Sequence, residues 1–416
     1  MQHIARNFIT RGISQNALLI SALGVRSLST AASSSPVSRA IVYSANGPAS
    51  SVLKVVSYKL APLTPKTVYL KFLAAPINPS DINTIEGSYP IQVKLRNLEK
   101  EGAEEEQHDK VKYVKKGRIT EENGLVAVCG NEGVAEVIEV GSEVKNIKKG
   151  EWVIMRRSGF GTWRTYAAAF ADDLIPIDCT SISPIVASTI SVNPCTAYRM
   201  LKDFVKLKEG DCIVQNGANS AVGQMVIQLA KFWGLTSINI VRERSNYNEV
   251  VQHLRSLGAT YVIPDTMLTT PSSLSQFVSS LPPSTNAVLG LNCVSGPIAT
   301  HMCKLLSPSA TVVTYGAMSL QPIRLAASLL IFKDFRFVGF WMTRWYKEME
   351  AKGGNDRKEM LEELLDMFRT GKINVPQYDV VKWGQEESEE EALNTVSNIL
   401  KKRTKMNAKK QIFSMV

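Results

Sequence analysis

Residues 212–233 carry the pattern of a nucleotide-binding turn. An apolar strand at 212–215 is followed by Asn-Gly-Ala-Asn-Ser-Ala-Val-Gly over 216–223 and by an amphipathic helix over 221–233. Small residues in such a turn let the backbone approach a pyrophosphate, and the N–H groups at the start of the helix can bind its charge. Asn219 stands where a strict G-x-G-x-x-G has its second glycine. The turn alone therefore does not distinguish a nucleotide site from other glycine-containing turns.

Arg242 and Arg244 follow the next predicted strand, where an NAD-specific fold presents an acidic side chain to the ribose. Two guanidinium groups at this position suit a 2′-phosphate instead. The sequence therefore predicts NADPH as the cofactor. The alternative is a solvated basic loop in which Glu243 still binds the ribose.

A candidate proton donor lies in residues 78–90, which read Asn-Pro-Ser-Asp-Ile-Asn-Thr-Ile-Glu-Gly-Ser-Tyr-Pro. We expect this polar, proline-bounded segment to be a loop, the usual place for chemistry. The phenol of Tyr89, with an ordinary pKa of about 10, can hydrogen-bond a developing negative charge and then donate its proton. On composition alone, a tyrosine packed in a turn is the alternative interpretation.

Two kinds of region must position these residues. From residue 41 to about 177, short apolar and β-branched runs separated by turns indicate strands. From residue 195 to about 340, strand and helix patterns alternate, which indicates a doubly wound parallel sheet. The sequence thus predicts an α/β protein with a β-rich domain over 40–193 and a Rossmann-type domain over 194–345. Residues 346–416, with a charged helix near 358–369 and a strand near 378–381, are expected to return to the first domain.

Residues 1–39 have the composition of a mitochondrial transit peptide. They contain Arg6, Arg11, Arg26 and Arg39, no acidic residue, and six serines between 27 and 38. A secretory signal and a disordered basic tail are the alternatives. The apolar run at 17–25 is short and ends at Arg26, and the six cysteines show no paired spacing of a disulfide framework. We therefore expect the mature protein in the mitochondrial matrix.

The charge distribution argues against a nucleic-acid-binding protein. The 416 residues carry a formal charge of +10, but the excess lies mostly at the two ends, with six basic residues between 401 and 410. Residues 94–122 contain eight basic and eight acidic residues, and we expect them to form an exposed insertion of no net charge. No apolar run reaches the roughly 18 residues of a membrane span. The alternative of a basic nucleic-acid-binding or regulatory protein with a vestigial Rossmann fold lacks interleaved aromatic residues in the C-terminal run.

A β-rich domain before a dinucleotide fold resembles the medium-chain dehydrogenase/reductase superfamily, which implies a GroES-like catalytic domain. Its alcohol dehydrogenases hold zinc through Cys, Gly-His-Glu and a later Cys. The corresponding motif here reads Gly-Asn-Glu-Gly over 130–133, so an amide replaces the histidine ligand. The chain therefore resembles a member without zinc, and we expect no metal site.

Several motifs together resemble mitochondrial trans-2-enoyl-thioester reductases, particularly the fungal ones. They are residues 78–90, 130–133, 161–165, 192–198, 215–223 and 242–244. The resemblance covers roughly residues 40–416 and implies reduction of enoyl-CoA or enoyl-acyl-carrier-protein with NADPH in mitochondrial fatty-acid synthesis, by a homodimer. The insertion at 94–122 departs from the family pattern just after the segment that carries Tyr89.

The resemblance also assigns roles to individual residues. Tyr89 matches the catalytic tyrosine. The cofactor contacts it implies are Asn193, Asn219, Ser220, Ala221, Val222, Arg242, Glu243, Arg244, Tyr315, Gly316, Ala317, Met318, Phe340, Trp341, Met342, Thr343 and Lys410. An ordinary buried strand end is the alternative for residues 340–343. An NADPH quinone reductase of the same superfamily is the alternative enzyme, since it would share the cofactor half and the missing zinc.

Overall fold

The computed structural model describes residues 35–103, 112–115, 124–384, 388–403 and 409–415. The predicted transit peptide lies outside these ranges except for its last five residues. Strand β1 (Val37–Tyr43) begins before the predicted leader end at residue 39, and Ser38 and Arg39 are buried in it. No helix in the described ranges is long and apolar enough to cross a membrane.

The first half of the chain is built from antiparallel strands, and its short apolar and β-branched runs predict strands. β1 pairs with β2 (Lys54–Lys59) and β6 (Ala127–Val128) in one sheet. A second sheet has the order β10-β8-β7-β3-β18-β17, with β9 also paired to β3. Its strands are β3 (Thr67–Pro76), β7 (Val134–Val140), β8 (Trp152–Met155), β9 (Tyr166–Phe170), β10 (Leu174–Ile177), β17 (Tyr378–Lys382) and β18 (Lys410–Ser414).

The charged insertion is only partly described, and the expectation that it is exposed is wrong for its first part. After the short strand β4 (Lys94–Leu95), which pairs with β5 (Lys112–Tyr113), Leu98 is buried in a hydrophobic cluster. Glu101 forms ion pairs with Arg96, at 2.5 Å, and with the fully buried Arg164. A partner 63 residues away in sequence therefore draws this acid into the core.

The second half contains a six-stranded parallel sheet in the order β13-β12-β11-β14-β15-β16. This order, with helices between the strands, confirms the predicted doubly wound fold. The strands are β11 (Cys212–Asn216), β12 (Thr236–Val241), β13 (Tyr261–Pro264), β14 (Ala287–Asn292), β15 (Thr311–Thr314) and β16 (Arg336–Gly339).

The helices that follow or precede these strands bury apolar side chains, except the one at residues 327–331, which buries none. They are α3 (Pro184–Thr189), α4 (Asn193–Asp203), α5 (Ala221–Phe232), α6 (Tyr247–Ser256), α7 (Pro271–Ser280), α8 (Gly296–Met302), α9 (Ala327–Ile331), α10 (Met342–Lys352) and α11 (Asp356–Arg369). One cluster of buried side chains runs from β3 and β7 through α4 and α5 to α11. The two halves therefore share a continuous core.

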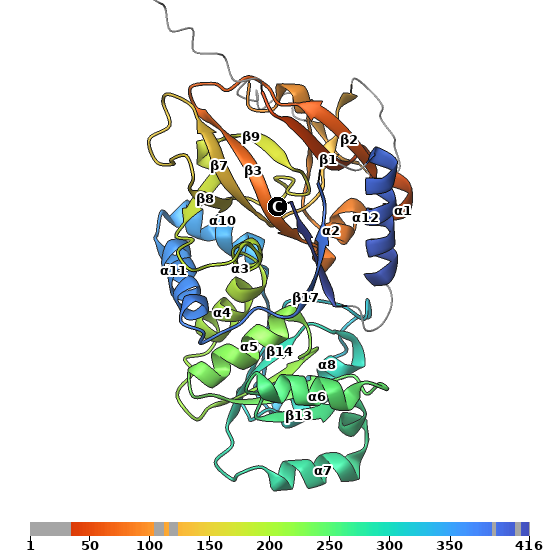
Figure 1. Cartoon of the computed structure of the whole chain (residues 1–416). Coiled ribbons are helices and arrows are strands. Elements are labelled where there is room, and N and C mark those ends of the chain that lie inside the picture. Colours follow the sequence, from red (N-terminus) through yellow and green to blue (C-terminus); the bar gives the residue numbers. More distant parts are fainter. Residues whose placement is uncertain (1–34, 104–111, 116–123, 385–387, 404–408, 416) are drawn as a thin grey trace, which may run out of the picture. The chain divides into compact units, whose positions relative to one another are not determined.

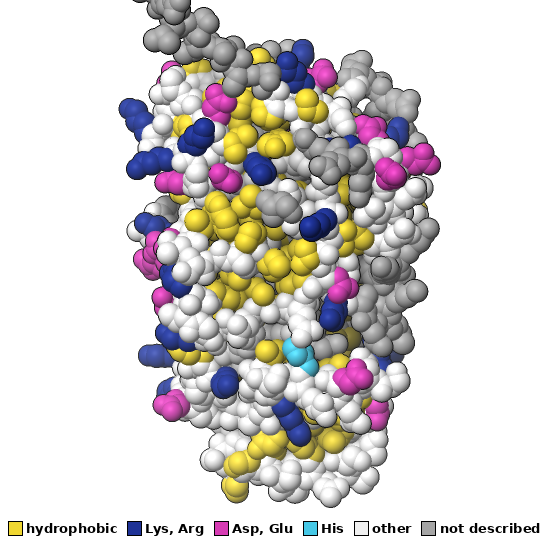
Figure 2. Space-filling view, in the orientation of Figure 1, with side chains coloured by type: hydrophobic (Ala, Val, Ile, Leu, Met, Phe, Trp, Pro, Cys, Tyr) yellow, Lys and Arg dark blue, Asp and Glu magenta, His cyan; other side chains and the backbone are white. Residues whose placement is uncertain are grey.

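The C-terminal segment lies against the β-rich half (Figure 1). β18 pairs with β3, and helix α12 (Glu389–Arg403) packs on β2 and on α1 (Ala49–Val52). Ala392, Val396 and Ile399 of α12 are buried there. On the face drawn in Figure 2, Lys and Arg side chains lie among Asp and Glu side chains and form no continuous basic surface.

Candidate active site

The segment that carries Tyr89 contains a helix, so the prediction of a loop over residues 78–90 is wrong. Helix α2 (Pro79–Ile85) begins with proline at its first position, and Asp81 in its first turn accepts a hydrogen bond from the backbone N–H of Asn78 at 2.6 Å. Both features favour a helix start. The N-x-x-D spacing with proline was the sequence signal for this helix. After α2, Gly87 turns the chain with φ +75° and the Tyr89 N–H bonds to the carbonyl of Asn83.

The phenol of Tyr89 meets a side chain from the other half of the molecule. Trp341, which immediately precedes α10, donates its indole N–H to the Tyr89 oxygen at 2.8 Å. The two rings stand edge to face, with centroids 6.0 Å apart. Burial raises the pKa of Tyr89 above its ordinary value of 10 although the bond from Trp341 lowers it, so the group is a neutral phenol at physiological pH. A phenol that accepts one bond can still donate its own proton to a second partner.

The other predicted residues around Trp341 divide into two groups. The side chains of Phe340 and Met342 are buried in the shared core, where Phe340 packs edge-on against Phe204. Thr343 lies 3.1 Å from the hydroxyl of Ser158, which follows β8. The side chains of Trp341 and Thr343 therefore face the β-rich half, whereas those of Phe340 and Met342 are buried in the core.

The side chains of Asn193 and Lys410 both contact the side-chain amide of Asn78. The Lys410 ammonium donates to the side-chain oxygen of Asn78 at 2.7 Å, and the Asn193 amide approaches the same oxygen at 3.4 Å. The Asn78 amide nitrogen donates to the carboxylate of Glu132 at 2.8 Å. Asn78 and Glu132 were not among the predicted site residues, because no sequence spacing reveals a contact between residues 332 positions apart.

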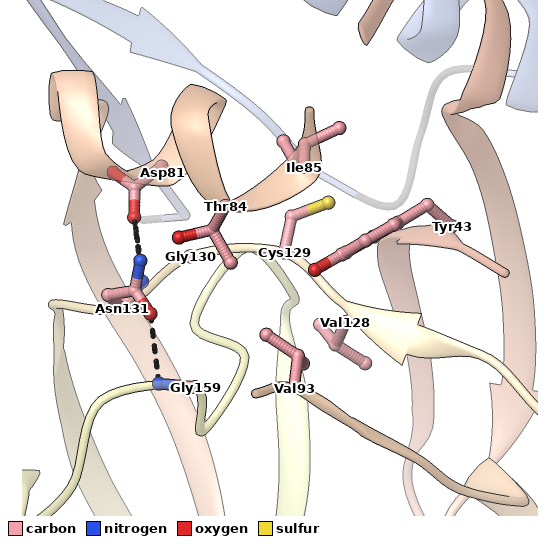
Figure 3. Close-up of a pocket in the computed structure, with 10 residues that line it drawn as sticks. All are labelled: Tyr43, Asp81, Thr84, Ile85, Val93, Val128, Cys129, Gly130, Asn131 and Gly159. Carbon is pink, nitrogen blue, oxygen red and sulfur yellow. Dashed lines mark hydrogen bonds between the residues drawn. The ribbon is translucent and has the colours of Figure 1, made fainter. Parts of the chain in front are cut away.

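Asn131, which replaces the histidine of the zinc enzymes, is held on two sides. Its backbone and side-chain N–H groups donate to Asp81, at 3.0 and 2.8 Å, and its side-chain oxygen accepts from the N–H of Gly159 at 2.9 Å (Figure 3). Behind it lies a cavity of about 10 Å³, lined by Tyr43, Thr84 and Cys129 among others. This space suits a single water molecule. In the described part of the chain no three His, Cys, Asp or Glu side chains are grouped to hold a metal ion.

The predicted nucleotide-binding turn joins β11 to α5. Gly217 takes φ +61°, and a Cβ there would lie 2.5 Å from the sulfur of Cys293. Ser220 caps α5 by accepting from the N–H of Gly223 at 3.1 Å. A Cβ on Gly223 would meet the carbonyl of Ala218 at 2.5 Å. The two glycines permit a tight turn into a 12-residue helix, which fits a pyrophosphate at the helix start.

The basic residues after β12 lie at the carboxyl end of the same sheet. Arg242 is exposed and Arg244 is half-buried. The carboxylate of Glu243 accepts from the hydroxyl of Thr266 at 2.5 Å, and its backbone N–H donates to Asp265. Glu243 is thus already held by the segment after β13, and the two arginines flank it.

The loops after β14 and β15 form the next wall of this end of the sheet. Asn216 of β11 accepts from the N–H groups of Cys293 and Val294, at 2.8 and 3.1 Å, and donates to Asn292. The Tyr315 N–H bonds to the carbonyl of Asn292. Beyond it the chain passes through Gly316 and Ala317 to Met318, which is 64% exposed. These loops follow neighbouring strands, where parallel sheets bind their ligands.

Comparison with known proteins agrees with this arrangement. Residues 64–179 match the family described as alcohol dehydrogenase GroES-like domain, and residues 221–364 match the zinc-binding dehydrogenase family. The human protein named mitochondrial enoyl-[acyl-carrier-protein] reductase is 40% identical over 338 residues, covering 81% of this chain and 80% of its own. The Schizosaccharomyces pombe protein of the same name is 37% identical over 378 residues, covering 90% and 95%.

Solved structures of fungal enzymes are similar over most of the chain. A complex of Etr1p with NADP and crotonyl-CoA has a TM-score of 0.79 and 31% identity, and it covers 91% of this chain and all of its own. An Etr1p/Etr2p heterodimer of the mitochondrial 2-enoyl thioester reductase from Candida tropicalis gives the same values.

Proposed function

This chain belongs to the mitochondrial enoyl-[acyl-carrier-protein] reductase family of the medium-chain dehydrogenases, and we propose that it reduces trans-2-enoyl thioesters to saturated acyl thioesters with NADPH. The protein is an oxidoreductase that acts on a carbon–carbon double bond. It works in the mitochondrion, as its relatives do by name.

NADPH when bound supplies a hydride for the β-carbon of the thioester. The turn into α5 binds the pyrophosphate with backbone N–H groups, and Arg242 and Arg244 hold the 2′-phosphate. These contacts fix the nucleotide at the carboxyl end of the parallel sheet.

Tyr89 supplies the proton in this reaction. As negative charge develops on the thioester oxygen, the neutral phenol donates a hydrogen bond to it and then supplies the proton for the α-carbon. Trp341 holds the phenol oxygen by its indole N–H at 2.8 Å, which fixes where the proton points. The observation that carries this proposal is the contact between these two side chains, since it brings an acid of the β-rich half to the cofactor half.

The test follows NADPH oxidation by residues 35–416, which keep all of β1, with a series of trans-2-enoyl-CoA substrates, and identifies the saturated product by mass spectrometry. NADH and a quinone are the control substrates. We expect rapid, NADPH-dependent formation of the saturated thioester. Turnover of the quinone with no reaction of the enoyl thioesters would instead support a quinone reductase. A matched series on an acyl carrier protein then compares the two thioester carriers.

We also propose that the protein is a homodimer. Strand β16 lies at the edge of the parallel sheet, and the segment before it exposes large apolar side chains: Leu320 is 91%, Ile331 70% and Phe332 80% exposed. An exposed apolar segment beside a sheet edge favours contact with another chain. Light scattering should give the mass of two chains, and Ile331→Asp should shift the mass toward one chain. A single-chain mass for the unaltered protein would contradict a homodimer and leave a heterodimer, as in the Candida enzyme, to be sought.

A further inference from the structure

Glu132 is a buried carboxylate. In the part of the chain that the structure describes, its side chain is not hydrogen-bonded to Tyr89 or Trp341. It is 1% exposed and accepts three hydrogen bonds: from Asn78, from the hydroxyl of Ser191 at 3.2 Å and from the N–H of Val192 at 2.7 Å. A buried charge is costly unless it is hydrogen-bonded in this way. Its donors come from the residues just before α2 and just before α4, so one side chain ties the starts of two helices together.

The carboxylate also fixes which way the Asn78 amide faces. Because the amide nitrogen donates to Glu132 at 2.8 Å, the amide oxygen must face away from it. That oxygen accepts from Lys410 of β18 and is approached by Asn193 at the start of α4. A reversed amide would place its N–H₂ group against the Lys410 ammonium. The orientation of Lys410 therefore depends on Glu132 through one intervening side chain.

We propose that Glu132 is a positioning residue that holds Lys410 and Asn193 in the arrangement that binds NADPH, and that it does so only as a carboxylate. The proposal rests on the function proposed above, since that assigns Lys410 and Asn193 to the cofactor. It adds a role for Glu132, which acts on Lys410 and Asn193 through Asn78.

The ionised form is the one that satisfies the three donors. A proton on the Glu132 oxygen that accepts from Asn78 would face the amide N–H of Asn78, so that hydrogen bond would be lost. Burial raises the pKa of Glu132 to about 7, against the lowering effects of Asn78, Lys410 and Val192 and with a further rise from Asp81. As the pH falls through neutrality, Glu132 gains a proton and the hold on Lys410 weakens.

Three titratable groups that face Glu132, besides Asp81 and Lys410, do not change charge in this range. Burial raises the pKa of Cys195 on α4 to about 12. It also raises the pKa of Tyr378 on β17 and of Tyr346 on α10 well above 10. Between pH 5.5 and 8.5 these three groups stay protonated. A transition near neutrality in this cluster is therefore not attributable to Cys195, Tyr378 or Tyr346.

The experiment measures the NADPH dissociation constant by fluorescence titration from pH 5.5 to 8.5. NADH is titrated in parallel, because the 2′-phosphate of NADPH itself ionises near pH 6 and NADH lacks it. For the unaltered protein we expect affinity for both nucleotides to fall about tenfold from pH 8 to pH 6. Glu132→Gln should bind about tenfold more weakly at pH 8 and show little further change with pH. Glu136→Gln on β7, a half-exposed neighbour, is the matched control and should behave as the unaltered protein.

A second variant guards against misfolding of Glu132→Gln. Asn78→Ser removes the link to Lys410 but leaves the bonds of Glu132 to Ser191 and Val192. Lys410→Met should weaken NADPH binding in the unaltered background and have little additional effect beside Asn78→Ser. Unchanged affinity and pH slope in Glu132→Gln, or additive effects of Asn78→Ser and Lys410→Met, would overturn the proposal. Because nucleotide binding is measured without a thioester, failure of the enoyl reductase activity is a separate result.

Discussion

The two halves of the described chain bury polar side chains of different kinds. The charged residues that are almost fully buried all lie in the β-rich half: Arg39, Asp81, Glu132 and Arg164. The parallel sheet instead buries neutral amides, among them Gln215, Asn216, Asn239 and Asn292. A half that binds an anionic nucleotide through backbone N–H groups gains from having no buried acid near them. A half that handles a proton can use ionised groups, provided each is paired.

The largest effect on activity is expected when the hydroxyl of Tyr89, in the β-rich half, is removed. Tyr89→Phe keeps the ring against Trp341 but removes the O–H, so kcat should fall roughly 100-fold or more. NADPH affinity should be nearly unchanged because the Tyr89 hydroxyl is not among the proposed nucleotide contacts. Tyr113→Phe, an exposed tyrosine of β5, is the control and should retain full activity. Near-normal turnover by Tyr89→Phe would exclude Tyr89 as the acid.

Loss of a buried charge should cost more stability than loss of a buried amide. Glu101→Gln leaves the fully buried Arg164 without its carboxylate partner, and we expect unfolding free energy to fall by about 3 kcal/mol in denaturant titration. The exposed Glu99→Gln should lie within about 0.5 kcal/mol of the unaltered protein. Equal stability of the two variants would mean that the ion pair does not hold this half together.

The pH dependence of this effect has a definite sign. Burial alone would raise the pKa of Glu101, but Arg164 and Arg96 outweigh it and hold the pKa below its ordinary value of 4.5. The folded state therefore gains stability from this carboxylate above pH 4.5 and loses it as the pH falls through the lowered value. The difference between Glu101→Gln and the unaltered protein should shrink below pH 4.5. A difference that grows in acid would contradict the assignment.

The arginines after β12, in the half with the parallel sheet, should affect NADPH more than NADH. Replacing both Arg242 and Arg244 by Ala should raise the Michaelis constant for NADPH about 30-fold, or roughly 2 kcal/mol, since each can make charge-assisted bonds to a phosphate. The constant for NADH should change far less. Lys231→Ala, an exposed charge near the far end of α5, is the control. Equal effects on the two nucleotides would show that the arginines do not recognise the 2′-phosphate.

The smallest effect is expected for a neutral amide. Asn216→Ala removes the acceptor of the Cys293 and Val294 N–H groups and should lower unfolding free energy by about 1 kcal/mol, with no pH dependence between 5 and 9. Asn216→Asp would place a charge in the same site and should be the more damaging change. If Asn216→Ala cost as much as Glu101→Gln, the two halves would not differ in how they are stabilised.

The sequence predicts the strands and helices of the half with the parallel sheet well, because each depends on residues that are close in the sequence. The strand expected at 212–215 and the helix at 221–233 correspond to β11 and α5, with ends within one residue. The fold class, the enzyme class and the cofactor are likewise confirmed by the related proteins. Tyr89 and the individual cofactor contacts stay predictions until they are tested by substitution.

The β-rich half was harder to predict, because its buried charged side chains contact residues that are distant in the sequence. Helix α2 was missed although Asn78, Pro79 and Asp81 carry a helix start. The pairing of Glu101 with Arg164 and the chain from Glu132 through Asn78 to Lys410 leave no periodic signal. A balanced run of charges indicates solvent exposure only when no partner from elsewhere in the fold reaches it.

Isotope transfer tests most directly the claim that the two halves deliver a hydride and a proton to one double bond. Reduction of a trans-2-enoyl-CoA in heavy water with unlabelled NADPH should give a saturated product with one solvent deuterium, at the α-carbon. Reduction in ordinary water with NADPH deuterated at C4 of the nicotinamide should place one deuterium at the β-carbon. Absence of the saturated thioester, or solvent deuterium at the β-carbon, would contradict the account.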